Sequence, residues 1–121
     1  MAVLDVRQEI RDAAVIVSAS GEIDTGSVEV LVDCLDSALK AACEHPARLL
    51  IVELAEVTYF GSAGLNAVLG CYERGLSGGV SVRVVASNAE VIMPITVTKL
   101  DDMLKPYRTV SDALAGTDGS P

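Results

Sequence analysis

Residues 49–76, LLIVELAEVTYFGSAGLNAVLGCYERGL, indicate a buried strand followed by a helix, and this pair is the centre of the predicted fold. Residues 48–54 form an almost unbroken apolar run, which is typical of a central strand buried on both faces of a sheet. Residues 55–61 are expected to connect it to a helix over 62–76, whose apolar residues recur at helical spacing. A buried strand that leads into a helix is the repeating unit of parallel sheets.

A hairpin and another helix are expected before this segment. Residues 3–8 alternate between apolar and polar side chains, and residues 14–20 form a second apolar strand after a polar turn, which indicates an antiparallel hairpin. The Gly, Asp and Ser content of residues 21–27 marks a loop that opens a helix, with Ser27 as the expected N-cap. That helix should end at His45, because the residue before Pro46 disfavours the helical conformation.

The remaining elements follow the helix that Gly78 and Gly79 end. The sequence predicts a strand over 80–86, a helix over 88–97, a short fifth strand over 103–107 and a last helix that begins with the capping box of Thr109 and Asp112. These elements indicate an α/β fold with a mixed, mostly parallel sheet of about five strands and about four helices. One domain is expected over residues 1–116, with a flexible tail over 117–121.

The acidic composition excludes some classes of partner. The formal net charge is −8, and the 9 Lys and Arg residues are scattered along the chain. Binding to nucleic acid is therefore not expected, because phosphates are attracted by clustered positive charge. The acidity either steers the domain toward a basic partner surface or only keeps it soluble. With no signal peptide and no apolar run of transmembrane length visible, a cytoplasmic protein without membrane contact is expected.

Neither an enzyme nor a metal protein is expected. Cys34, Cys43 and Cys71 match no zinc spacing and are expected to be apolar fillers, with a redox role of one pair as the alternative. His45 is the single histidine, which excludes a His-pair metal site, and the GSAG sequence at 61–64 differs from the GxSxG elbow of hydrolases. No dinucleotide or P-loop motif is present, so no cofactor is expected.

Ser62 stands where the sequence predicts an anion site. The start of a helix leaves backbone N–H groups free and carries partial positive charge. A phosphate on the Ser62 hydroxyl would lie beside these donors and add about −1.5 to −2 charge units. Ala63 and Gly64 are small, so a partner could approach the backbone closely. The plainer alternative is that Ser62 only caps the helix.

Two short motifs resemble the STAS domains, the anti-sigma-factor antagonists. Residues 61–65, Gly-Ser-Ala-Gly-Leu, resemble the family's Asp-Ser-Ser/Thr-Gly-Leu, which opens a helix after an apolar strand. Residues 21–24, Gly-Glu-Ile-Asp, resemble its Gly-Glu-Leu-Asp after the second strand, and residues 91–104 resemble its third helix and the turn that follows. The resemblance extends over residues 3–115.

The resemblance implies a partner-switching cycle. In such a cycle the unphosphorylated antagonist binds an anti-sigma factor, which is often also a serine kinase, and thereby releases a sigma factor. Phosphorylation of the motif serine, here Ser62, breaks the complex, and a serine phosphatase restores it. The resemblance implies roles at the partner surface for Asp24 and Ser62. Their neighbours in the same loop and around the start of the helix are expected there as well: Thr25, Gly26, Ser27, Phe60, Gly61, Ala63, Gly64 and Asn66.

This chain departs from the family motif on both sides of the serine. Gly61 stands in place of the Asp, and Ala63 stands in place of the Ser or Thr. The loss of the Asp removes a negative charge beside the acceptor hydroxyl, which would alter recognition by a kinase. The alternative function is therefore a STAS module that does not switch and that acts as a scaffold or as a subunit of an ATPase or transport complex.

Overall fold

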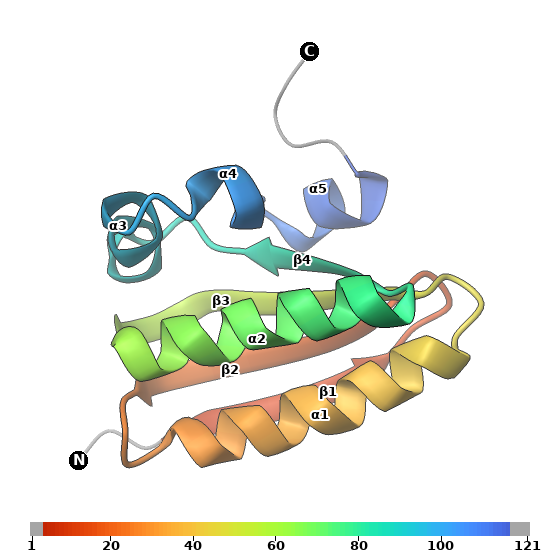
Figure 1. Ribbon diagram of the computed structural model, residues 1–121, viewed down its shortest axis with the longest axis horizontal. Coiled ribbons are helices and arrows are strands. Elements are labelled where there is room, and N and C mark those ends of the chain that lie inside the picture. The colour runs from red at the N-terminus through yellow and green to blue at the C-terminus, as the bar shows by residue number, and fades with distance from the viewer. Residues whose placement is uncertain (1–3, 117–121) are drawn as a thin grey trace.

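A computed structural model describes residues 4–116, and it contains a four-stranded sheet in the order β1-β2-β3-β4 (Figure 1). The strands are β1 (Asp5–Ile10), β2 (Val15–Ile23), β3 (Leu49–Phe60) and β4 (Ser81–Val85). β1 runs antiparallel to β2, whereas β2, β3 and β4 are parallel. The predicted hairpin and the mixed, mostly parallel sheet are thus confirmed. The tail predicted over 117–121 lies outside the described residues.

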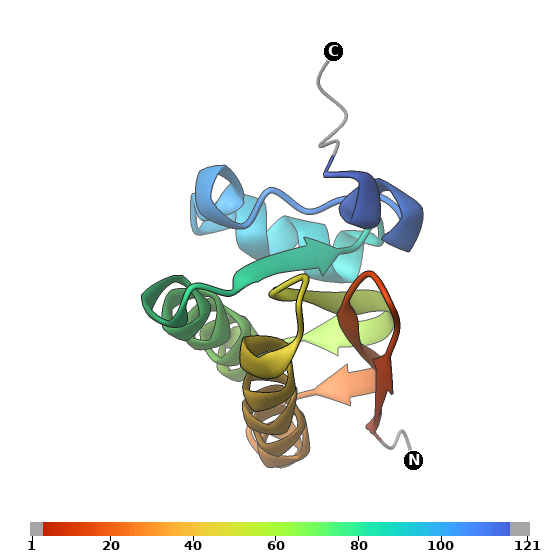
Figure 2. The same cartoon turned by 90° about the vertical axis from the view of Figure 1, so that its right-hand side faces the viewer.

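Helices cover the two faces of the sheet unequally. α1 (Val28–Glu44) and α2 (Ser62–Gly78) lie side by side across one face, and their apolar residues form the main core with that face. α3 (Ala89–Val97) and α4 (Asp101–Leu104) follow β4, and Val91 and Ile95 of α3 extend the same core. α5 (Val110–Ala115) packs on the opposite face, where Ala113 joins a smaller cluster with Ile16 and Ile51 (Figure 2).

The connection predicted over 55–61 is wrong, because β3 continues to Phe60. β2 is also longer than predicted and ends at Ile23, so that the two strands stay paired through Glu22 with Tyr59 and Ile23 with Phe60. Two register shifts interrupt this pairing. Such irregularities break the alternation of apolar and polar residues, which is why the sequence pattern hides the second half of β3.

The fifth strand predicted over 103–107 is also wrong. The chain forms the short helix α4, with Leu104 N–H donating to Leu100 O at 2.8 Å and Lys105 N–H donating to Asp101 O at 3.0 Å. Only Tyr107 reaches the sheet, as an isolated parallel bridge to Val85. Pro106 precedes it and has no N–H to donate to a strand ladder, so pairing cannot extend toward the N-terminal side. The described chain accordingly has four strands and five helices.

The start of α2 packs closely on the ends of β2 and β3. A Cβ atom at Gly64 would lie 2.7 Å from Ile23 Cγ2 and 3.0 Å from the Phe60 ring, so only glycine fits this contact. The buried side of α2 consists of Gly64, Leu65, Val68, Cys71 and Gly75. Leu76, which the helical spacing placed on the apolar stripe, is 62% exposed. The predicted end of the helix is confirmed, because Gly79 is its C-cap with a left-handed φ of 77°.

The three cysteines are free, and they differ in burial. Cys71 lies in the main core, and burial raises the pKa of its thiol to about 12. Burial also raises the pKa of the half-buried Cys34 thiol. Cys43, near the end of α1, is exposed. The apolar-filler prediction is thus confirmed for Cys71, whereas Cys43 is open to reagents.

Substitution of the two α2 glycines by alanine should have opposite effects. Gly64→Ala should lower the free energy of unfolding by about 1–3 kcal/mol, because the new methyl group overpacks against Ile23 and Phe60. Gly70→Ala is the matched control in the same helix, since a Cβ there meets nothing within 4 Å. It should raise the free energy of unfolding by up to about 1 kcal/mol through helix propensity. Urea denaturation measures both, and a stabilising Gly64→Ala would contradict the packing.

The thiols should react with iodoacetamide in the order of their exposure. At pH 8 the folded protein should be alkylated at Cys43, while Cys71 stays unmodified, because the thiolate is the nucleophile and the Cys71 pKa lies near 12. Peptide mass spectrometry identifies the labelled residue. In the urea-unfolded control all three cysteines should react. Equal labelling of Cys71 and Cys43 in the folded protein would contradict the buried position of Cys71.

Candidate functional site

Two loops meet at the carboxyl ends of the parallel strands β2 and β3. Ile23 pairs with Phe60 at the last step of the ladder, and Gly61 N–H donates to Ile23 O at 3.1 Å. The loop that begins with Asp24 therefore lies beside the start of α2 at Ser62. In open α/β sheets, ligands bind at this edge, outside the carboxyl ends of the strands.

Hydrogen bonds within the Asp24–Ser27 loop fix its shape. Asp24 Oδ1 accepts from Gly26 N–H at 2.9 Å and from Ser27 N–H at 3.0 Å. Ser27 Oγ donates to Glu22 O at 2.8 Å and accepts from Asp24 N–H at 3.0 Å. Ser27 is the N-cap of α1, as predicted, but its side chain makes no hydrogen bond to the helix and closes the loop instead. Asp24, Thr25 and Gly26 are exposed.

Ser62 is exposed and is the first residue of α2. The alternative in which Ser62 caps the helix is wrong, because Gly61 is the N-cap and its extended backbone, with φ −81° and ψ 178°, leads into the helix. The helix ladder begins with Leu65 N–H donating to Gly61 O at 3.1 Å. No side chain caps α2, so the N–H groups of its first turn point toward the open end of the helix. The Ser62 hydroxyl is thus available beside free donors.

A hollow of about 130 Å³ lies between the two loops. We call its lining the Ser62 surface; its residues are Asp24, Thr25, Tyr59, Gly61, Ser62 and Ala63. Five of the predicted partner-binding residues come together here. Asn66 is exposed one turn further along α2, and Gly26 and Ser27 complete the first loop behind Asp24.

Two predicted partner-binding residues are buried, and one exposed residue was missed. Phe60 is only 4% exposed, and Gly64 is buried against it, so both belong to the core that supports the site. Tyr59 is 53% exposed and lines the Ser62 surface in their place. Of these two neighbouring aromatic side chains, Phe60 faces the core and Tyr59 faces outward. The shift of the β2–β3 register between Gly21 and Glu22 decides which one faces outward.

Asn88 holds the irregular part of β3 that leads to the site. Its Nδ2 donates to Leu54 O at 3.1 Å and to Val57 O at 2.7 Å, across the first register shift of β3. Carbonyl groups at such a shift lose their ladder partners, and a side-chain amide satisfies them. Asn88 thereby fixes the course of β3 toward Tyr59 and Ser62.

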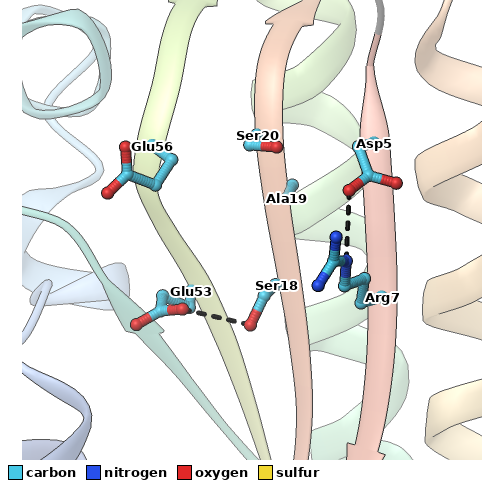
Figure 3. Close-up of a pocket in the computed structure, with 7 residues that line it drawn as sticks. All are labelled: Asp5, Arg7, Ser18, Ala19, Ser20, Glu53 and Glu56. Atoms are coloured by element: carbon cyan, nitrogen blue, oxygen red, sulfur yellow. Dashed lines mark hydrogen bonds and ion pairs between the residues drawn. The ribbon is translucent and has the colours of Figure 1, made fainter.

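A second hollow, of about 200 Å³, lies on the sheet face opposite α1 and α2 (Figure 3). Ser18 Oγ donates there to Glu53 Oε1 at 3.0 Å, and Arg7 Nε lies 3.2 Å from Asp5 Oδ2. These side chains lie on β1, β2 and β3, and none of the residues that line this hollow lines the Ser62 surface.

His45 lies at the other edge of the sheet from Ser62, since it follows α1 and precedes β3. Its Nε2 donates to Arg11 O at 2.7 Å, and its Nδ1 accepts from Ala47 N–H at 3.0 Å. Both ring nitrogens are therefore used to tie the β1–β2 turn to the turn before β3. A Ser-His pair with Ser62 is excluded, because the 12 residues of β3 separate the two side chains.

Within residues 4–116 no helix has the length and apolar character needed to cross a membrane.

Comparison with known proteins identifies one family. The family model for the STAS domain matches residues 5–113. A search of curated proteins gives no significant match. Among solved structures, an anti-sigma factor antagonist from Mycobacterium paratuberculosis is 29% identical, with a TM-score of 0.84 over 94% of this chain and 93% of that one.

Two structures of SpoIIAA are more distant. The anti-sigma factor antagonist SpoIIAA in its unphosphorylated form has a TM-score of 0.73 at 16% identity, over 97% of this chain and 99% of that one. The phosphorylated form of the Bacillus protein has a TM-score of 0.68 at 15% identity, over 93% and 98%. At these identities the likeness concerns the fold. The family model, which spans nearly all described residues, decides the assignment: the chain belongs to the STAS domain family.

Proposed function

We propose that this protein is an anti-sigma-factor antagonist that binds an anti-sigma factor through the Ser62 surface and is not itself an enzyme. The observation that carries the proposal is the exposed Ser62 at the first position of α2, beside the exposed Asp24 loop. The Asp24 loop and the start of α2 each follow directly on a strand whose last residue is buried. They therefore present a preformed surface to a partner. The Mycobacterium protein, described as an anti-sigma factor antagonist, supports the proposal through its similarity over nearly the whole chain.

We further propose that phosphorylation of Ser62 switches this binding off. The hydroxyl is exposed and makes no capping bond, so a kinase could reach it without unfolding α2. A phosphate would be held by the free N–H groups of the first helical turn. It would also place about −1.5 to −2 charges in the middle of the contact surface. SpoIIAA, which shares the fold, has been described in both phosphorylation states.

The departures at Gly61 and Ala63 support a second function, namely a STAS module that binds constitutively as a scaffold or as a subunit of a larger complex. Neither residue offers the charge or hydroxyl that the family motif carries beside the serine. In this case the domain would bind its partner without becoming a substrate of a kinase. The two functions differ in whether Ser62 gains a phosphate.

Phosphorylation is tested by incubating the protein with ATP, magnesium and each candidate anti-sigma kinase from the source genome. One kinase should add a single phosphate-sized mass to the intact protein, and Ser62→Ala should remove this gain, because Ser62 is the exposed hydroxyl at the start of α2. Intact-mass spectrometry reads the result. Binding to a kinase without any mass gain would support the constitutive module instead. A gain that persists in Ser62→Ala would disprove the assignment of the site.

Binding is tested with a charge substitution at the same residue. Ser62→Asp should weaken binding to the anti-sigma factor at least about tenfold, because it adds a charge to the centre of the contact surface. Isothermal titration calorimetry measures the dissociation constant. Ser62→Ala, as the neutral control, should bind within about threefold of the wild type, since the hydroxyl makes no capping bond. Equal binding of Ser62→Asp and the wild type would contradict the proposed contact surface.

A further inference from the structure

The ring of Tyr59 lies over the backbone of Gly61. A Cβ atom at residue 61 would lie 3.1 Å from Tyr59 Cε2 and 3.2 Å from Tyr59 Oη. These distances are shorter than ordinary van der Waals contacts, so the outer edge of the ring fills the space of a side chain at residue 61. A Cβ atom at residue 61 would therefore shift the ring by a few tenths of an ångström, and a longer side chain would compete with the ring for the same space.

The chain fixes the base of Tyr59 but leaves its ring on the surface. The next residue, Phe60, is anchored in the core against Gly64, and Tyr59 pairs with Glu22 in the β2–β3 ladder. The side chain of Tyr59 nevertheless is 53% exposed. Leu76, another exposed large apolar side chain, lies at the far end of α2 from this edge.

An exposed tyrosine on a rigid support is suited to binding a protein. Tyrosine gives a large contact area with few side-chain torsions to immobilise, and it is enriched among residues that dominate binding energy. Tyr59 lines the same hollow as Ser62 and Asp24. A partner that covers Ser62 must therefore contact the Tyr59 ring.

We infer that Tyr59 is a specificity-determining residue of the Ser62 surface and that Gly61 positions its ring. The inference rests on the proposed function, because it assumes a partner that covers Ser62. The partner should offer a pocket for a phenol ring next to its contact with Ser62. A partner built to meet a negative charge at residue 61 should be excluded, since an aromatic edge occupies that place here.

The test uses the anti-sigma factor that binds the wild-type protein most tightly among those of the source genome. Calorimetric titration gives its dissociation constant for wild type, Tyr59→Ala, Gly61→Ala and the double variant. Tyr59→Ala should weaken binding about tenfold or more, as expected for a central tyrosine. Gly61→Ala should weaken binding by less than Tyr59→Ala does, because its Cβ shifts the ring by only a few tenths of an ångström. The double variant should be within about twofold of Tyr59→Ala alone, because residue 61 acts only through the ring.

Leu76→Ala is the matched control, since it removes another large exposed side chain, at the other end of α2. It should bind like the wild type, and thermal unfolding should show that all variants are folded. If Tyr59→Ala binds like the wild type while Ser62→Asp does not, the inference is overturned and the proposed function stands. Additive losses in the double variant would overturn the positioning role of Gly61. If no anti-sigma factor binds the wild type, the proposed function and the inference both fail.

Discussion

The parallel pairing of β2 with β3, continued to Ile23 and Phe60, is the constraint on which the rest of the structure depends. Both strands leave the sheet at the same edge, and the hydrogen bond from Gly61 N–H to Ile23 O closes the gap between them. The start of α1 and the start of α2 are therefore brought together. Had β3 ended at Leu54, as the apolar run indicated, the loop before Ser62 would have lacked this fixed support.

A buried contact converts that pairing into a defined surface. Gly64 lets α2 approach Ile23 and Phe60 so closely that no side chain fits between them. Gly61 is the N-cap of α2, so the Ser62 hydroxyl makes no capping hydrogen bond. The two glycines thus have separate effects: Gly64 sets the height of the helix above the sheet, and Gly61 leaves room for the Tyr59 ring. The positions of the exposed Ser62 and Tyr59 side chains thus depend on how closely the buried residues beneath them pack.

The sequence predicted the elements whose pattern is regular. The apolar run before Leu54, the helix from Ser62, the glycine end of that helix and the hairpin at the N-terminus were all found, as were five of the six residues that line the Ser62 surface. The second half of β3 was missed, because register shifts place Thr58 and Tyr59 both outward and break the alternation. The choice between Tyr59 and Phe60 depends on strand pairing, which a local pattern does not contain. The strand predicted over 103–107 did not form, because α4 occupies its first residues and Pro106 cannot donate to a strand ladder.

The geometry also indicates how a switch at Ser62 would act. Its hydroxyl is exposed and uncommitted, and the residues below it are fixed by the core. A phosphate there would find backbone donors at the helix start and would break no existing hydrogen bond of the Ser62 side chain. The fold would therefore remain the same in both states, and the change would be confined to charge and bulk on the surface. Such a change would act on the partner through the added charge and bulk at the contact surface, and it would need no rearrangement of α1 or α2.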